Sequence, residues 1–345
     1  MSTHAQEIKD FLIQEIDKGS TPLVRIAGER FAISRQAVNR YLRQLVADGV
    51  ATADGKTKGR KYTLAFLAQD TFATNIVPGL SDDQVWREKV RPLLDGVREN
   101  VIGICNYSFT EIFDNALEHS EGTEIGTVVR RTAATVELRV IDNGVGIFNK
   151  IKRELNLEDQ RHAVLELSKG KLTTDARSHT GEGIFFTSRA CDRFSILSGG
   201  LLLHHTHEQG SWLLDEMPSA GGTSVSMKIS VFSGRILKSV FDEYKAAKDD
   251  YGFTRTHVPV FLARYGDENL VSRSQAKRLV SRLDRFSEIV LDFAGVETVG
   301  QAFADEIFRV FQQEHPGAHL TWVNVKPEVN EMILRAKSHD EGPSR

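Results

Sequence analysis

The sequence of 345 residues lacks the features that define several classes of protein. It contains only two cysteines, Cys105 and Cys191, too few for a disulfide framework, so the composition favours a reducing compartment. No apolar run approaches the roughly 20 residues that span a bilayer, and the N-terminus has neither the basic start nor the apolar segment of a secretory signal. We therefore expect a cytoplasmic protein without a membrane-spanning segment.

The chain also lacks a strong excess of charge of one sign, since its net charge is −3. Any nucleic-acid site must then be local. Residues 1–65 contain eleven Lys and Arg against seven Asp and Glu, a net charge of +4, so the remainder carries −7. This asymmetry indicates a small basic module attached to an acidic body. The length suits two or three domains.

Residues 1–65 are predicted to form three short helices followed by two strands. Ser34 is expected to cap the third helix, whose outward side carries basic and amide side chains suited to phosphates and base edges. The candidate DNA-binding residues are Arg35, Gln36, Asn39, Arg40 and Arg43 on this helix, and Lys56, Lys58 and Arg60 between the strands. A solvated basic helix is the alternative interpretation.

The stretch SRQAVNRYLRQLVADGVAT (residues 34–52) resembles the recognition helix, turn and first wing strand of the winged helix-turn-helix of bacterial regulators. The resemblance implies double-stranded DNA as a partner. Such domains usually bind paired half-sites as dimers, so a homodimer is expected. A winged helix used only for protein contacts is the alternative.

Polar and glycine-rich signals follow one another in the centre of the chain. Glu111 and Asn115 share one face of a predicted helix, where a carboxylate can polarise water and an amide oxygen can help hold Mg²⁺. Asp142 ends a predicted strand, and the glycines at 144 and 146 let the backbone pass close to a flat ring. Thr180-Gly181-Glu182-Gly183 opens a predicted helix whose free N–H groups suit phosphate. Taken singly, each signal also fits a helix surface, an ordinary turn or a capped loop.

In the order Glu-x3-Asn, Asp-x-Gly-x-Gly, Gly-x-Gly and Gly222-Thr223, these motifs resemble the Bergerat-fold ATPases over about residues 100–230. That superfamily, GHKL, includes the ATP-hydrolysing component of DNA gyrase, heat-shock chaperone ATPases, MutL and histidine-kinase catalytic domains. The resemblance implies an α/β sandwich that binds ATP with Mg²⁺. The chain contains no P-loop pattern.

The same resemblance assigns roles to individual residues. Glu111 would be the catalytic base or water-orienting residue, Asn115 a Mg²⁺ ligand, and Asp142 the acceptor for the adenine amine. Residues 165–180 would form a lid over the nucleotide. The implied nucleotide-binding residues are Asn115, Asp142, Gly144, Gly146, Lys171, Thr180, Gly181, Gly183 and Thr223, with Lys169 and Arg177 as other candidates for the terminal phosphate.

The segment EIVLDFAGVETVGQAFADEIFRVF (residues 288–311) resembles a STAS-like domain. In anti-anti-sigma factors of this fold, Asp-Ser stands at the turn before the helix, and the serine is phosphorylated. Gly300 and Gln301 occupy these positions here, so the phosphorylatable hydroxyl is missing. The resemblance implies a regulatory, protein-binding role.

Together these patterns predict a multidomain α+β protein. The expected segments are a winged helix-turn-helix domain (1–66), a connector and lead-in helix (67–100), a Bergerat α/β sandwich ATPase domain (101–232), a helical linker (233–250) and a small STAS-like α/β domain (251–345). The expected function is that of an ATP-binding, ATP-hydrolysing, DNA-binding transcriptional regulator. The alternative is a protein kinase of the anti-sigma or histidine-kinase type, although residues 66–110 contain no histidine to serve as a phosphoacceptor.

Overall fold

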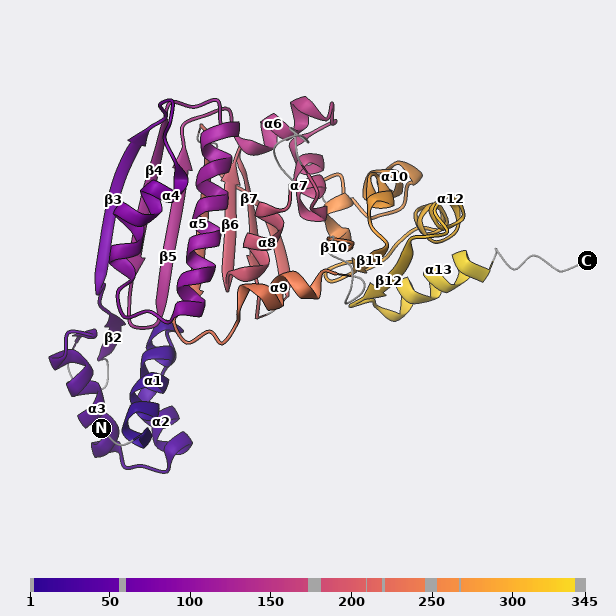
Figure 1. The fold of residues 1–345 in the computed structure, drawn as a ribbon. Helices are drawn as coiled ribbons and strands as arrows, with labels where there is room; N and C mark the ends of the chain where they lie inside the picture. The colour runs from indigo at the N-terminus through magenta and orange to yellow at the C-terminus, as the bar shows by residue number, and fades with distance from the viewer. Residues whose placement is uncertain are drawn as a thin grey trace, which may run out of the picture.

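The computed structural model describes residues 3–55, 60–172, 181–208, 210–218, 221–245, 253–266 and 268–338. These residues form three parts in chain order, a small helical unit with a two-stranded sheet, a seven-stranded sheet covered by helices, and a three-stranded sheet with its own helices (Figure 1). The fold is therefore a mixture of helices and strands in several units, as expected.

The N-terminal unit contains the three helices and two strands predicted from its sequence. Ser34 caps the third helix as expected, because its hydroxyl oxygen accepts a hydrogen bond of 3.2 Å from the backbone N–H of Ala37. Ile8, Leu12 and Leu42 pack in the core of this unit. Its elements are α1 (Thr3–Asp17), α2 (Leu23–Phe31), α3 (Arg35–Ala47), β1 (Ala51–Asp54) and β2 (Lys61–Leu64).

The central sheet is antiparallel throughout, in the order β3-β4-β5-β9-β6-β7-β8. Buried and half-buried side chains alternate along β9, as expected for strands with one face on a core. The strands are β3 (Ala68–Asn75), β4 (Glu124–Arg131), β5 (Thr135–Asp142), β6 (Arg193–Ser198), β7 (Leu201–Thr206), β8 (Ser211–Glu216) and β9 (Thr223–Ser230).

Residues 67–100 do more than connect two domains. The sequence predicted a connector and a lead-in helix here, whereas residues 68–75 form β3 and pair with the whole of β4 at the edge of the sheet. This strand is polar and largely exposed, so it carries little apolar periodicity to reveal it. The helical turns α4 (Asp82–Val85), η2 (Trp86–Val90) and η3 (Arg91–Leu94) follow.

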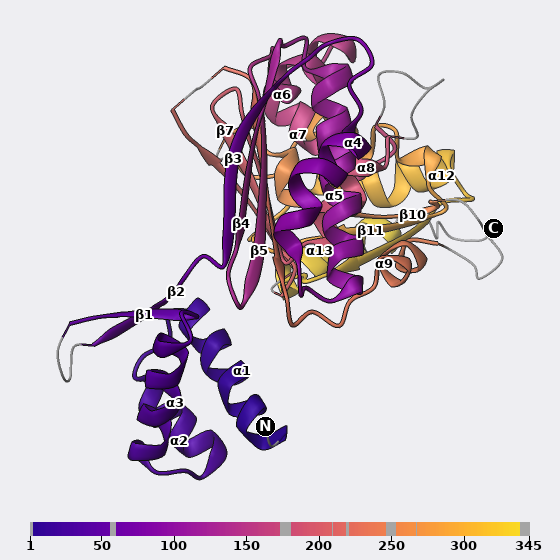
Figure 2. The same ribbon diagram turned by 60° about the vertical axis from the view of Figure 1, so that its left-hand side comes forward.

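Helices cover one face of the central sheet. Figure 2 shows α5 (Glu99–His119) and α8 (Gly183–Ala190) on the same side of the strands. Phe109 and Phe113 of α5 are fully buried against this face. Between β5 and α8 the chain forms α6 (Ile147–Glu154) and α7 (Gln160–Lys169), so the first residues of the expected lid belong to a helix.

The C-terminal unit is built on a parallel sheet in the order β10-β11-β12. Strand β10 ends at Pro259, and the chain continues as the 3₁₀ turn η4. The elements are α9 (Leu237–Glu243), β10 (Arg255–Pro259), η4 (Val260–Ala263), α10 (Arg273–Val280), η5 (Leu283–Arg285), β11 (Glu288–Asp292), α11 (Gln301–Asp305), η6 (Glu306–Phe311), α12 (Gln312–Glu314), β12 (His319–Val323) and α13 (Pro327–Ser338).

The N-terminal unit contacts the end of the central sheet. Lys228 of β9 forms an ion pair of 3.1 Å with Asp17 at the end of α1. Ala134, beside the β4–β5 turn, and Phe232, after β9, pack against the core of the N-terminal unit. In the part of the chain that the structure describes, no helix combines the length and the apolarity needed to cross a membrane.

We predict that Leu42→Ala destabilises the N-terminal unit by about 2–5 kcal/mol, because it leaves a cavity where a fully buried side chain packs. Denaturant unfolding, with hydrogen exchange of residues 3–47 as a local readout, measures this loss. Leu213→Ala, at an exposed position of β8, is the control and should change stability by less than about 0.5 kcal/mol. Equal effects of the two substitutions would contradict the described core.

Candidate functional site

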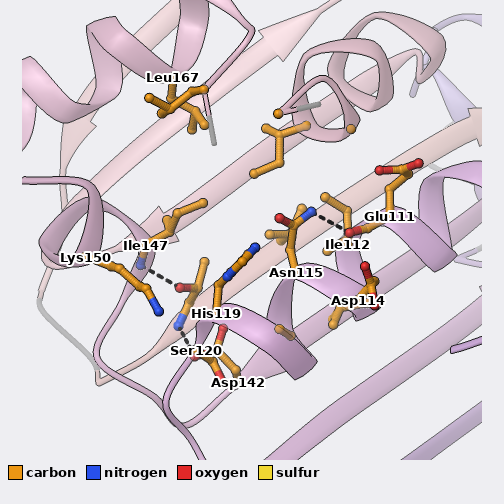
Figure 3. A pocket seen from close by; sticks show the side chains of 18 of the residues that line it. Glu111, Ile112, Asp114, Asn115, His119, Ser120, Asp142, Ile147, Lys150 and Leu167 are labelled. Carbon is orange, nitrogen blue, oxygen red and sulfur yellow. Dashed lines mark hydrogen bonds between the residues drawn. The ribbon is translucent and has the colours of Figure 1, made fainter. Parts of the chain in front are cut away.

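A cavity of about 340 Å³ lies between α5, the central sheet and the beginning of α8. Its volume falls in the range of small-molecule sites. Figure 3 shows Glu111, Asn115 and His119 of α5 facing the same space as Ile147 and Lys150 of α6. Six of the residues predicted to bind nucleotide or act on it line this cavity, namely Glu111, Asn115, Asp142, Gly181, Gly183 and Thr223.

The ends of two neighbouring strands form the floor of the cavity. Asp142, the last residue of β5, lies opposite Thr223, the first residue of β9. The Asp142 carboxylate accepts hydrogen bonds from the backbone N–H groups of Gly144 (2.9 Å) and Thr223 (3.2 Å). The Thr223 hydroxyl in turn accepts a hydrogen bond of 2.9 Å from the N–H of Ile147. The carboxylate is therefore held in one orientation.

Asp142 is buried, with only 6% of its surface exposed. Burial raises the pKa of Asp142 above its ordinary value, although the two backbone N–H groups favour the charged form. A desolvated carboxylate with lone pairs still available is a strong acceptor for an N–H donor on a ligand.

Glu111 and Asn115 lie one helical turn apart on α5. The side-chain amide of Asn115 donates a hydrogen bond of 2.5 Å to the Glu111 carbonyl, which leaves its own oxygen as an acceptor beside the cavity (Figure 3). The Glu111 carboxylate lies against the first residue of α8, because a Cβ on Gly183 would stand 1.9 Å from Glu111 Oε2. A helix N-terminus favours negative charge at this position.

The glycines of the Asp-x-Gly-x-Gly motif contribute to the turn rather than to the cavity wall. Gly144 packs against the end of α5, where an added Cβ would lie 2.0 Å from the Ser120 carbonyl oxygen. Gly146 has a φ of +84°, a conformation that favours glycine. Neither residue lines the cavity.

Lys150 and His119 are among the cavity residues that the motifs did not single out. Lys150 lies 3.3 Å from Glu121 and 3.7 Å from Glu154, with its side chain largely buried at the cavity. Its spacing of three residues from Ile147 on α6, which places both side chains on one helix face, was the available signal. His119, at the end of α5, also lines the cavity.

Lys171, another residue predicted to bind nucleotide, does not line the cavity. Its ammonium group donates a hydrogen bond of 2.9 Å to the carbonyl of Arg285 in the C-terminal unit. Lys169 is buried and also bonds to that unit, through the carbonyls of Arg278 and Ser281. Thr180 and Arg177 lie outside the described residues.

The candidate DNA-binding side chains lie on the outer face of α3. Arg35, Gln36, Arg40 and Arg43 are exposed, and Asn39 is half-buried beside them. Arg60 is exposed at the start of β2, whereas Lys56 and Lys58 fall outside the described residues. None of these three α3 arginines forms an ion pair with another described residue, so the face carries uncompensated positive charge.

Comparison with protein families finds a match for one part of the chain. A family model described as a STAS-like domain of unknown function (DUF4325) matches residues 275–330. The match runs from α10 to the beginning of α13, so the C-terminal unit is STAS-like, as the sequence predicted. A comparison with curated proteins finds no match.

We predict that Asp142→Asn raises the melting temperature at about pH 7. Below the ordinary pKa of 3.8 the carboxyl is protonated in both the folded and the unfolded protein. As the pH rises toward the higher pKa of the folded state, the folded protein must ionise a desolvated group and loses stability. The neutral amide avoids that loss, so the advantage of Asp142→Asn should shrink as the pH falls toward about 4.

Thermal unfolding of both proteins across this pH range measures the difference. Asp215→Asn, at an exposed position of β8, is the matched control and should follow the wild-type profile. A lower melting temperature for Asp142→Asn at neutral pH would contradict the account of a desolvated carboxylate.

Proposed function

We propose that the chain binds ATP with Mg²⁺ in the cavity between α5 and the central sheet, and that nucleotide binding controls a DNA-binding N-terminal unit. The observation that carries the proposal is the convergence on one cavity of Glu111 and Asn115, of Asp142 and Thr223, and of the backbone at Gly181 and Gly183. These residues come from four separate parts of the sequence, in the order that resembles the Bergerat-fold ATPases.

The chemistry of the cavity suits a purine nucleotide. Asp142 offers a fixed, desolvated acceptor for an exocyclic amine. Ile147, Val225 and Leu167 provide apolar surface for a flat ring. The start of α8, with Gly181 and Gly183 at the cavity, offers backbone N–H groups to phosphate oxygens.

The donor set also suits Mg²⁺ bound together with phosphates. Protein sites for nucleotide-bound Mg²⁺ commonly supply one or two oxygen ligands and leave the rest to phosphate and water. Asn115 would supply one such oxygen, and Glu111 would orient or deprotonate a water molecule for hydrolysis. When bound, Mg²⁺ neutralises phosphate charge and so favours transfer of the terminal phosphoryl group.

The N-terminal unit is proposed as a winged helix-turn-helix that places α3 in the major groove of DNA. Its uncompensated arginines suit phosphates and guanine edges. Only Ala65, Phe66 and Leu67 separate β2 from β3, and the N–H of Leu67 donates to the carbonyl of Arg131 in the central sheet. This short connection ties the unit to the sheet that bears Asp142, so in a homodimer a nucleotide-dependent rearrangement would change the spacing of the two DNA-binding heads.

We predict that calorimetry detects binding of Mg²⁺ with a non-hydrolysable ATP analogue to the full chain, and that Asp142→Asn weakens it about tenfold or more. The amide puts an N–H donor where the ligand amine needs an acceptor, which leaves a buried donor unpaired. Asp215→Asn is the control and should bind like the wild type. Absence of binding to the wild type, or equal affinity of Asp142→Asn, would refute the proposed nucleotide site.

We predict that Arg35→Ala and Arg40→Ala each weaken binding to a mixed-sequence DNA duplex and lower the slope of log affinity against log salt concentration. Each arginine that neutralises a phosphate contributes about one unit to that slope. Fluorescence anisotropy at several salt concentrations measures both quantities. Arg87→Ala, at an exposed position of η2 in the central unit, should leave both unchanged. Identical slopes for all three variants would argue against α3 as the DNA-binding helix.

A further inference from the structure

The segment Lys169–Leu172 runs between the cavity and the C-terminal unit. Leu172 lines the cavity, and its backbone N–H donates a hydrogen bond of 3.1 Å to the carbonyl of Gly181, another cavity residue. The side chain of Lys171, one residue earlier, extends away from the cavity toward the C-terminal unit. The wall of the cavity and the surface of the C-terminal unit are thus joined through consecutive residues.

The C-terminal unit holds Lys171 by both its side chain and its backbone. The ammonium group donates to the Arg285 carbonyl and lies 4.7 Å from the centre of the Phe286 ring and 5.7 Å from that of Phe253. The Lys171 carbonyl accepts a hydrogen bond of 3.1 Å from the Arg282 guanidinium. A carbonyl and two aromatic faces together make a site for a cation.

Lys169 is held by the same unit. It is 1% exposed, and its ammonium group donates to Glu166 (2.5 Å) and to the carbonyls of Ser281 (2.8 Å) and Arg278 (3.1 Å). Its own carbonyl accepts a hydrogen bond of 2.7 Å from the Thr256 hydroxyl of β10. Both lysines next to the cavity wall are therefore bound to the C-terminal unit.

Beside an aromatic core that includes Phe185 and Phe253, opposite charges also meet at this interface. On the central side, Asp159 caps α7 and Glu166 lies within that helix. On the C-terminal side, Arg278 lies 3.0 Å from Asp159, and Arg282 lies 3.7 Å from Glu166. Since Arg278 and Glu166 are almost fully buried, reversing one of these charges would leave a buried like-charge contact.

We propose that the C-terminal unit inhibits the nucleotide site in cis by holding Lys171 away from the cavity. This inference rests on the proposed nucleotide binding. Once the C-terminal unit separates, Lys171 can turn its ammonium group toward the phosphates, since its neighbour Leu172 already forms the cavity wall. The phosphates and the Arg285 carbonyl then compete for one cation. By linkage, separation tightens nucleotide binding, and nucleotide favours separation to the same extent.

The test opens the interface without changing a cavity residue. Arg278→Glu places a negative charge opposite Asp159, and hydrogen exchange of residues 255–259 in β10 reports whether the units separate. The probe is Mg²⁺ with a non-hydrolysable ATP analogue, measured by calorimetry on the full chain. We expect Arg278→Glu to bind it about tenfold more tightly than the wild type, as for one charge-assisted hydrogen bond.

Lys171→Ala tests whether tighter binding in Arg278→Glu comes from Lys171 itself or from an unspecific effect of separating the units. In the wild-type background it should change affinity by less than about twofold, because Lys171 does not contact the cavity there. Combined with Arg278→Glu it should abolish the tenfold gain. Arg278→Lys, which keeps the charge opposite Asp159, should bind like the wild type.

A second variant controls for the possibility that Arg278→Glu acts by misfolding the C-terminal unit. Glu166→Arg sets a like charge against Arg282 and against Lys169, and it leaves the C-terminal sequence intact, so it should reproduce the gain. If the units separate in either variant without tighter binding, or if the gain survives Lys171→Ala, the inhibition is refuted while nucleotide binding stands. If the wild type and all the variants fail to bind the analogue, the proposed function fails and this inference with it.

Discussion

The antiparallel pairing of β5 with β9 is the constraint on which the candidate site depends. Its register places Asp142 opposite Thr223, and both residues lie on the buried face of the sheet, toward α5. A slip of one residue would turn Asp142 to the outer face, because side chains alternate along a strand. Val140 and Val225 lie on the same face and pack in the core under the helices. A change of register would remove them from that core, so the packing of the helices favours the observed register. The position of one carboxylate is thus an outcome of the whole sheet.

The burial of Asp142 and the tight turn that follows it lower the stability of the folded protein. Burial leaves Asp142 with a raised pKa, and the turn after it requires Gly144 to pack directly on Ser120. Such local costs are tolerated where a ligand is to be recognised, since a preorganised acceptor needs no rearrangement when it meets its donor. Lys171 and Lys169 show a different solution, because both ammonium groups donate to carbonyls of the C-terminal unit and Lys169 also pairs with Glu166 of α7.

Much of this fold could be predicted from local patterns. The strand predicted to end at Asp142 is β5, which ends at that residue, and the Ser34 cap predicted the start of α3. The STAS-like character of the C-terminal unit was implied by the resemblance of residues 288–311 and agrees with the family match. Each of these elements carries its signal in adjacent residues.

The features that escaped prediction depend on contacts between distant residues. The edge strand β3 is polar and largely exposed, and β8 has three adjacent apolar residues with no alternation, so pairing rather than periodicity makes them strands. Lys171 stands near a glycine-rich motif in sequence, but its direction is decided by a carbonyl at Arg285 and by Phe286. No pattern local to Lys171 contains that information.

A structure of the full chain with Mg²⁺ and a non-hydrolysable ATP analogue tests the central claim most directly. The account predicts that the exocyclic amine of the base lies within hydrogen-bonding distance of the Asp142 carboxylate, with the phosphates between Asn115 and the start of α8. A nucleotide seated elsewhere on the chain, or one whose base does not contact Asp142, would contradict it.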